Sequence, residues 1–239
     1  MNTSETTKIL QESYFRLQQH FGLQGWWPLY DSKINKIAYH PLDYSFPKNT
    51  QQAFEISVGA ILTQNTTWKN VEKALISLHQ YGLLTPDSIE KIPLAQLTII
   101  IRSSGYHRQK AKKLKEFVRF LASGKAITRN NLLDVWGIGP ETADSILLYA
   151  YQQPFFVIDA YTKRIMERIG YHTQTYDELQ QIFMISLSHD VNLFNEYHAL
   201  LVALGKEFCK KTDPLCEHCP LKKQCDYFLR KRSSADGER

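Results

Sequence analysis

The stretch from Leu132 to Arg164 constrains the fold of this 239-residue chain more than any other part. It reads LLDVWGIGPETADSILLYAYQQPFFVIDAYTKR, which predicts a helix, a tight Gly-x-Gly turn, a second helix, a short apolar run and an isolated acid. In the turn Gly137 and Gly139 flank Ile138, and glycine suits a positive φ or a close approach to the backbone. Unpaired N–H groups at such a turn bind a phosphate without side-chain charge, so these three residues form a predicted phosphate site.

The isolated acid is Asp159, which directly follows the apolar residues 155–158. A buried carboxylate costs free energy unless it has partners, so this position needs a physical reason. One interpretation is an N-cap of the following helix, and the other is a catalytic carboxylate at a helix start. The two roles are compatible, and the residue pattern alone leaves both open.

The charge and the termini limit the class of protein. The formal net charge is +5, from 29 basic and 24 acidic residues, which mildly favours an anionic partner. No apolar stretch is long enough for a membrane span, and the N-terminus MNTSETTKILQES lacks the apolar core of a signal peptide. We therefore expect a cytoplasmic protein with reduced thiols, in which clustered cysteines more often hold metal than form disulfides.

All four cysteines fall in one window near the C-terminus, spaced C-x6-C-x2-C-x5-C: Cys209, Cys216, Cys219 and Cys225. Thiolates this close together are most simply ligands of one metal centre. Zinc usually shows paired C-x2-C knuckles, and only one pair here is that tight. The four-thiolate alternative is a [4Fe–4S] cluster, and the spacing by itself leaves both metals possible.

Apolar periodicity predicts helices along most of the chain, and therefore an all-α fold class. The segments with helical patterns are 9–21, 51–62, 67–81, 85–92, 93–103, 109–121, 176–188 and 194–208. His20 and His198 lie in two of them, and we expect both to be packing or surface residues. Residues 31–49 are polar and broken by prolines, which favours irregular structure. The charged residues 229–239 suggest a disordered tail.

GIGPETADSI followed by FVIDAYTKRI resembles the helix-hairpin-helix and Gly/Pro-Asp signature of the endonuclease III superfamily of DNA glycosylases. In that family a hairpin of the L-P-G-[VI]-G-x-[KE]-T-A type grips a DNA phosphate. An Asp eighteen positions beyond the variable Lys does the chemistry, and Glu141 and Asp159 have this separation here (159 − 141 = 18). The resemblance, which covers about residues 51–225, therefore implies a catalytic role for Asp159.

Other segments of the chain carry the same resemblance. ILTQNTTW is similar to the family segment L-[SL]-x-Q-[ANT]-[TS]-D, which implies that Gln64 wedges into the duplex, with Trp68 one helical turn later. The segment with Tyr106 and Lys110 is similar to one that packs near the DNA, which implies phosphate contacts. The cysteine spacing matches the family's cluster loop, which implies a structural [4Fe–4S] cluster on a basic loop that reaches phosphates.

The resemblance also implies the domain organisation. The expected fold has two helical lobes with the active site between them. Residues 1–50 and 165–208 would form a terminal lobe, residues 51–164 a central lobe with the helix-hairpin-helix, and residues 209–225 the cluster loop. A monomer is the default state of this superfamily.

Glu141 occupies the position where bifunctional members of the family carry a Lys that forms a Schiff base with the sugar. Because a glutamate cannot form an imine, we predict a monofunctional glycosylase that leaves an abasic site. Asp159 would stabilise the oxocarbenium-like charge or direct a water to C1′. The expected partner is double-stranded DNA with a damaged base, which must be flipped out of the stack.

The tryptophans favour an alkylated purine as the damaged base. Such a base is cationic, is already weakly bonded to the sugar and stacks well on indole rings. Trp26, Trp27 and Trp68, with Glu141, are therefore candidate pocket residues, although core packing is the ordinary interpretation of the Trp26–Trp27 pair. The WWP loop ahead of TQNT resembles the type III 3-methyladenine DNA glycosylases, which implies base excision repair of alkylation damage. The alternatives are a G·T mismatch glycosylase, an oxidised-pyrimidine glycosylase with lyase activity, and a non-catalytic DNA-binding module.

Overall fold

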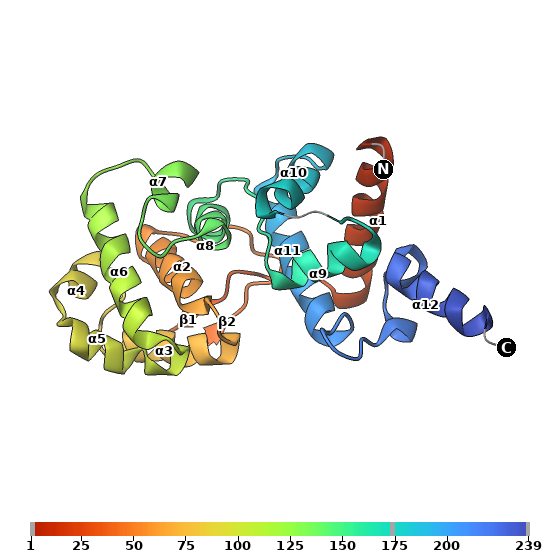
Figure 1. Cartoon of the computed structure of the whole chain (residues 1–239). Coiled ribbons are helices and arrows are strands. Elements are labelled where there is room, and N and C mark those ends of the chain that lie inside the picture. Colours follow the sequence, from red (N-terminus) through yellow and green to blue (C-terminus); the bar gives the residue numbers. More distant parts are fainter. Residues whose placement is uncertain (1–2, 173–174, 238–239) are drawn as a thin grey trace. The chain divides into compact units, whose positions relative to one another are not determined.

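The computed structural model of the chain describes residues 3–172 and 175–237, which divide into two compact units (Figure 1). Unit 1 consists of Met1–Gln24 and Pro154–Arg239, and unit 2 of Gly25–Gln153. The boundaries differ from the predicted ones at residues 50 and 164. Residues 25–50 belong to the central unit because the Tyr30 N–H donates to the buried Glu55 carboxylate at 2.7 Å. The segment that carries Asp159 belongs to the terminal unit.

Helix α2 (Thr50–Thr63) is the central element of unit 2, because every residue from Phe54 to Leu62 is buried. Asn49 caps its N-terminus by accepting a hydrogen bond from the Gln52 N–H at 2.9 Å. Around α2 lie α3 (Trp68–Gln80), α4 (Pro86–Lys91), α5 (Leu94–Ile100), a 3-10 turn (Arg102–Ser104), α6 (His107–Ala122), α7 (Arg129–Leu133), α8 (Pro140–Ser145) and a π-helical turn (Ile146–Ala150). α3, α6, α8 and the π-helical turn contact α2 directly, which makes one core.

The polar segment 31–49 was expected to be irregular, and this expectation is wrong for part of it. Strands β1 (Leu29–Asp31) and β2 (Lys36–Ala38) pair antiparallel, with Tyr30 opposite Ile37. The pairing is stabilised from outside the segment, since Tyr30 stacks on His79 at 3.9 Å between ring centroids. Strands of three residues are too short to show a period-two pattern in the sequence.

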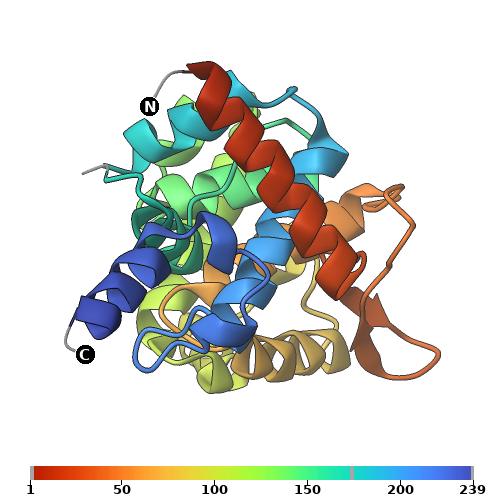
Figure 2. The ribbon, with the colours of Figure 1, turned by 90° about the vertical axis from the view of Figure 1, so that its right-hand side faces the viewer.

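Helix α11 (Val191–Glu207) is the central element of unit 1. α1 (Thr3–Phe21) and α9 (Ala160–Ile169) pack on it, and α10 (Tyr176–Ser186) packs on α1 (Figure 2). The core contains a stack of Phe156 on Phe183 with centroids 3.8 Å apart. The hydroxyl of Tyr197 donates to the Leu10 carbonyl at 2.9 Å, which ties α11 to α1. Helices were predicted in all of these segments.

The C-terminal segment differs from the predicted disordered tail, because helix α12 spans Asp226–Gly237. Phe228 at its start is buried, and the Arg168 guanidinium lies 5.0 Å from the Tyr227 ring centroid. These anchors come from the tertiary structure, whereas the residues after Phe228 lack an apolar stripe that the sequence could show. In the described ranges no helix combines the length and apolarity that a membrane crossing needs.

Candidate functional site

The predicted turn between helices α7 and α8 is present, and an ion pair braces it. Arg129 in α7 donates to both carboxylate oxygens of the fully buried Asp144 in α8, at 2.8 and 3.3 Å. Gly137 has φ +86°, and a Cβ there would lie 2.6 Å from Lys113 Cγ. Gly139 has an ordinary extended φ of −97°, and nothing lies within 4 Å of where its Cβ would be. Gly137 is therefore required by the fold, and Gly139 leaves open space in front of the turn.

Gln64, the predicted duplex wedge, lies at the C-terminal end of α2 and is tied to this turn. Its amide nitrogen donates to the Gly137 carbonyl at 3.1 Å and to Thr142 Oγ1 at 2.9 Å. Its amide oxygen accepts a hydrogen bond from the ammonium of Lys113. These partners fix which end of the amide is oxygen, since the nitrogen faces two acceptors and the oxygen faces a cation. The structure thus brings the predicted wedge and the predicted phosphate turn together.

Lys110 was predicted to contact phosphate, and the structure contradicts this. Its side chain is buried, with its ammonium donating to the Leu62 carbonyl at 2.7 Å and the Ser104 carbonyl at 2.6 Å. A lysine near the end of a helix can satisfy carbonyls that have no helical partner, and Lys110 does this for α2. Burial, and to a smaller extent the charge of Lys113, lower the pKa of Lys110 to about 8. Tyr106, by contrast, is 70% exposed with a left-handed backbone (φ 45°), available to an external partner.

The tryptophans predicted as pocket walls form one aromatic cluster in unit 2. The rings of Trp26 and Trp68 are close to parallel, with centroids 6.4 Å apart and planes at 29°. Trp27 meets Trp68 edge-on at 5.3 Å, and Tyr149 from the π-helical turn lies 5.1 Å from Trp27. Trp27 packs on Gly59 of α2, where a Cβ would lie only 3.1 Å from its Nε1. Trp27 is therefore core, whereas Trp26 and Trp68 keep part of their surface exposed.

Glu141 lies in the first turn of α8 and is exposed. A carboxylate is electrostatically favourable at a helix N-terminus. Glu141 occupies the position where the family resemblance places the Schiff-base lysine, and its carboxylate cannot form an imine.

Asp159 is the N-cap of α9, which confirms one of its two predicted roles. Its Oδ1 accepts a hydrogen bond from the Thr162 N–H at 2.7 Å, and its side chain is only 13% exposed. The buried His198 of α11 places Nε2 3.7 Å from the other carboxylate oxygen. Burial by itself would raise the pKa of Asp159, but His198 and the Thr162 N–H outweigh burial and hold that pKa below its ordinary value. Asp159 is therefore a nearly buried carboxylate that stays ionised at neutral pH.

The four cysteines line one cavity. Cys209 follows helix α11, Cys216 begins a 3-10 turn (Cys216–His218) that Cys219 ends, and Cys225 ends a second 3-10 turn (Lys222–Gln224). All four thiols are free and partly exposed. Arg168 of α9 donates to Cys209 Sγ at 3.1 Å and to the Lys210 carbonyl at 2.8 Å, which fixes the loop on unit 1. Burial, together with the neighbouring cysteines, raises the pKa of Cys219 to about 11. A common positive centre would therefore be needed to hold all four cysteines as thiolates.

Within residues 3–172 and 175–237, no three His, Cys, Asp or Glu side chains lie close enough together for a single metal ion. Four thiolates are the donor set of a structural zinc ion and also of a [4Fe–4S] cluster. The chemistry of the four cysteines therefore suits a metal centre of either kind.

Known proteins are similar to this chain in sequence and in fold. The sequence profile of the HhH-GPD superfamily of base excision DNA repair proteins matches residues 58–188. The chain belongs to this superfamily. A Methanocaldococcus jannaschii protein named as a DNA repair glycosylase is 37% identical over 233 residues, covering 91% of this chain and 96% of its own. Endonuclease III of Thermotoga maritima is 31% identical over 193 residues, covering 78% of this chain and 89% of its own.

Solved structures of HhH-GPD proteins resemble this chain in fold. The H. pylori 3-methyladenine DNA glycosylase MagIII, in a structure bound to 1,N6-ethenoadenine, is 26% identical with a TM-score of 0.66. The alignment covers 84% of this chain and 97% of MagIII. An endonuclease III–DNA complex is 19% identical, with a TM-score of 0.76 and coverage of 98% and 99%. The fold class and the assignment as a DNA glycosylase are therefore confirmed.

Two side chains contact candidate site residues, although the sequence predicted no role for them. His198 was expected to be a packing or surface residue, and it is buried against Asp159. Lys113 lies in helix α6, and its ammonium donates to the Gln64 amide oxygen. No local pattern marks either residue, since each acts on a partner far away in the sequence.

Proposed function

We propose that this HhH-GPD protein is a monofunctional DNA N-glycosylase that excises alkylated purines, such as 3-methyladenine, from double-stranded DNA. The observation that carries the proposal is the pair of nearly parallel indoles, Trp26 and Trp68, with centroids 6.4 Å apart. The two indoles would admit one flat base between them once their planes turn parallel and move apart. Each indole face attracts a cationic ring, worth roughly 0.5–2 kcal/mol where water is excluded.

Asp159 is the proposed catalytic carboxylate. When the bond between C1′ and the alkylated base breaks, the electron pair leaves with the base, which becomes neutral. Positive charge develops on the sugar, and an ionised carboxylate stabilises it. A water then adds to C1′ and loses a proton, which leaves an abasic site. The lowered pKa of Asp159 supports this role, because the carboxylate is charged before the reaction begins.

Glu141 supports the monofunctional part of the proposal. A lyase needs an amine that forms an imine with C1′ of the sugar, and the exposed carboxylate at this position has none. Strand breaks should therefore appear only after alkali treatment. The name of MagIII supports the substrate class, since that relative is a 3-methyladenine glycosylase and its structure holds a modified adenine.

DNA contacts are proposed for the turn at Gly137, Ile138 and Gly139, for the exposed Tyr106, and for Gln64. The open space in front of Gly139 supports a phosphate there, since the local fold does not itself require that glycine. Gln64 would enter the duplex from a position already fixed by the turn.

A [4Fe–4S] cluster is the proposed cofactor, held by Cys209, Cys216, Cys219 and Cys225. The cluster would crosslink the loop and contribute no step to base release. Lysines of the loop, Lys210 and Lys211 among them, would then face phosphate from a fixed backbone. Iron and sulfide analysis of the purified protein, with its visible absorption spectrum, tests this part separately.

The test of the function is one series of duplexes that contain a methylated purine, thymine glycol or a G·T mismatch, each analysed with and without alkali. We expect release of methyladenine, with strand cleavage only after alkali. Direct cleavage at thymine glycol would refute the monofunctional assignment. Activity on G·T alone would leave Asp159 in place and refute the alkylpurine pocket.

A further inference from the structure

The residue before the phosphate-binding turn, Trp136, is the most exposed of the four tryptophans, with 54% of its surface accessible. In the described part of the chain it makes no aromatic contact and no side-chain hydrogen bond. The other three tryptophans pack on one another. A single exposed aromatic side chain is ordinary on a protein surface, so its surroundings decide whether it marks an interaction site.

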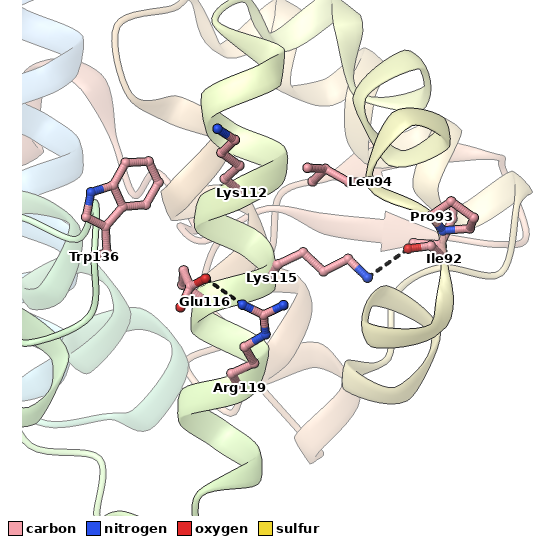
Figure 3. Close-up of a pocket in the computed structure, with 8 residues that line it drawn as sticks. All are labelled: Ile92, Pro93, Leu94, Lys112, Lys115, Glu116, Arg119 and Trp136. Atoms are coloured by element: carbon pink, nitrogen blue, oxygen red, sulfur yellow. Dashed lines mark hydrogen bonds and ion pairs between the residues drawn. The ribbon is translucent and has the colours of Figure 1, made fainter.

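Trp136 borders a groove of about 560 Å³ on the surface of unit 2 (Figure 3). The indole stands on one side of α6, Pro93 and Leu94 lie on the other, and charged side chains of α6 project between them. The groove therefore begins one residue away from the phosphate-binding turn.

The cations of this groove are not equivalent. Lys115 donates to the carbonyls of Glu90 and Ile92, and Arg119 donates to Glu116 at 2.7 Å. Lys112 is exposed and has no hydrogen-bond or ion-pair partner among the described residues. The groove thus offers one free ammonium beside one free indole, a pair that suits a nucleic acid strand, with phosphate for the cation and sugar or base for the ring.

We propose that Trp136 and Lys112 form a second DNA contact, in which the indole packs on a nucleotide next to the phosphate held by the turn and Lys112 binds a flanking phosphate. This inference rests on the proposed function, because it presumes that the turn holds DNA. The Cα atoms of Trp136 and Gly137 are neighbours in the chain and therefore only about 3.8 Å apart. A DNA strand bound at Gly137 would for this reason pass close to Trp136. The footprint then extends along α6 toward Pro93 and Leu94.

The test is the affinity of the full chain for a fluorescently labelled undamaged duplex, measured by anisotropy at several salt concentrations. We expect Trp136→Ala to weaken binding by at least about fivefold and Trp136→Phe to restore most of it. Lys112→Gln should reduce the slope of log K against log salt by about 1. Two control substitutions should change neither the affinity nor its salt dependence. They are Tyr81→Ala, at a 68% exposed aromatic residue elsewhere in unit 2, and Lys125→Gln, beyond the C-terminal end of α6.

Acrylamide quenching of tryptophan emission gives a second readout that needs no loss of affinity. DNA should protect the wild-type emission, and this protection should disappear in Trp136→Phe. Unchanged affinity in Trp136→Ala, or equal quenching of the wild type with and without DNA, would overturn this inference. The proposed function would stand in that case, provided that the wild-type chain binds the duplex. A wild-type chain that neither binds duplex nor releases a base would instead refute the proposed function itself.

Discussion

His198 Nε2 lies 3.7 Å from Oδ2 of Asp159, although the two residues are far apart in the sequence (198 − 159 = 39). The first belongs to α11 and the second caps α9, so the packing of these two helices creates the pair. Because both side chains are almost completely buried, water screens their interaction poorly. Because His198 lowers the pKa of the Asp159 carboxyl, we propose it as a positioning residue for that carboxylate.

Replacing the carboxylate of Asp159 by an amide should separate catalysis from folding. Asn is as good an N-cap as Asp, so Asp159→Asn should fold and bind duplex DNA like the wild type. Base release in single-turnover assays should fall by at least about a hundredfold, because the charge that stabilises the sugar cation is lost. Asp190→Asn is a matched control, since Asp190 caps α11 in the same unit by accepting from the Leu193 N–H at 2.7 Å. Base release near the wild-type rate in Asp159→Asn would refute the mechanism.

Removing the imidazole of His198 should change the pH dependence of base release. His198 lowers the pKa of Asp159, so in His198→Phe that pKa should rise and the acid limb of kcat/KM should move to higher pH. The same interaction stabilises the folded state above the unfolded-state pKa of Asp159, and this stability is lost as pH falls through the lower folded-state pKa. An unchanged acid limb would show that His198 only packs. His189→Gln, an exposed histidine of the same unit, is the control.

The two glycines of the turn should respond differently to alanine. Gly137→Ala should lower the free energy of unfolding by about 1 to 2 kcal/mol, because φ is +86° and the Cβ meets Lys113. Gly139→Ala should leave the melting temperature unchanged, since its φ is ordinary and the space is open. Its methyl group should nevertheless weaken DNA binding by obstructing the phosphate. Normal DNA affinity in Gly139→Ala would argue against a phosphate at this turn.

Lys110 should contribute to stability in a pH-dependent way. Lys110→Met leaves the carbonyls of Leu62 and Ser104 unsatisfied, which should cost about 2 kcal/mol in urea unfolding at pH 7. The folded-state pKa is about 8 and the ordinary value is 10.5, so between these pH values the unfolded chain binds more protons. Wild-type stability relative to Lys110→Met should therefore rise from pH 8 to pH 10.5. A constant difference across this range would contradict the lowered pKa. Lys125→Met is the exposed control.

The sequence predicted the helices, because apolar periodicity and capping residues act within a few turns. It also pointed to candidate site residues, since the turn at 137–139, Asp159 and the four cysteines are marked by short spacings. The segments it missed lack such local marks. Strands β1 and β2 depend on contacts with α2 and α3, and α12 depends on two aromatic anchors at its start.

The sequence by itself therefore determined the helical fold class and the superfamily, and it made Asp159 the candidate catalytic carboxylate. Only the tertiary structure decided which charges face water and which partners they have. In the folded chain the buried Lys110 ammonium donates to two carbonyls, His198 lies beside Asp159, and the Gln64 amide donates to the Gly137 carbonyl. The physical reason is distance along the chain. Except for the contact between Lys110 and Ser104, these contacts join residues tens of positions apart, so helix packing, rather than any local pattern, sets which side chains meet.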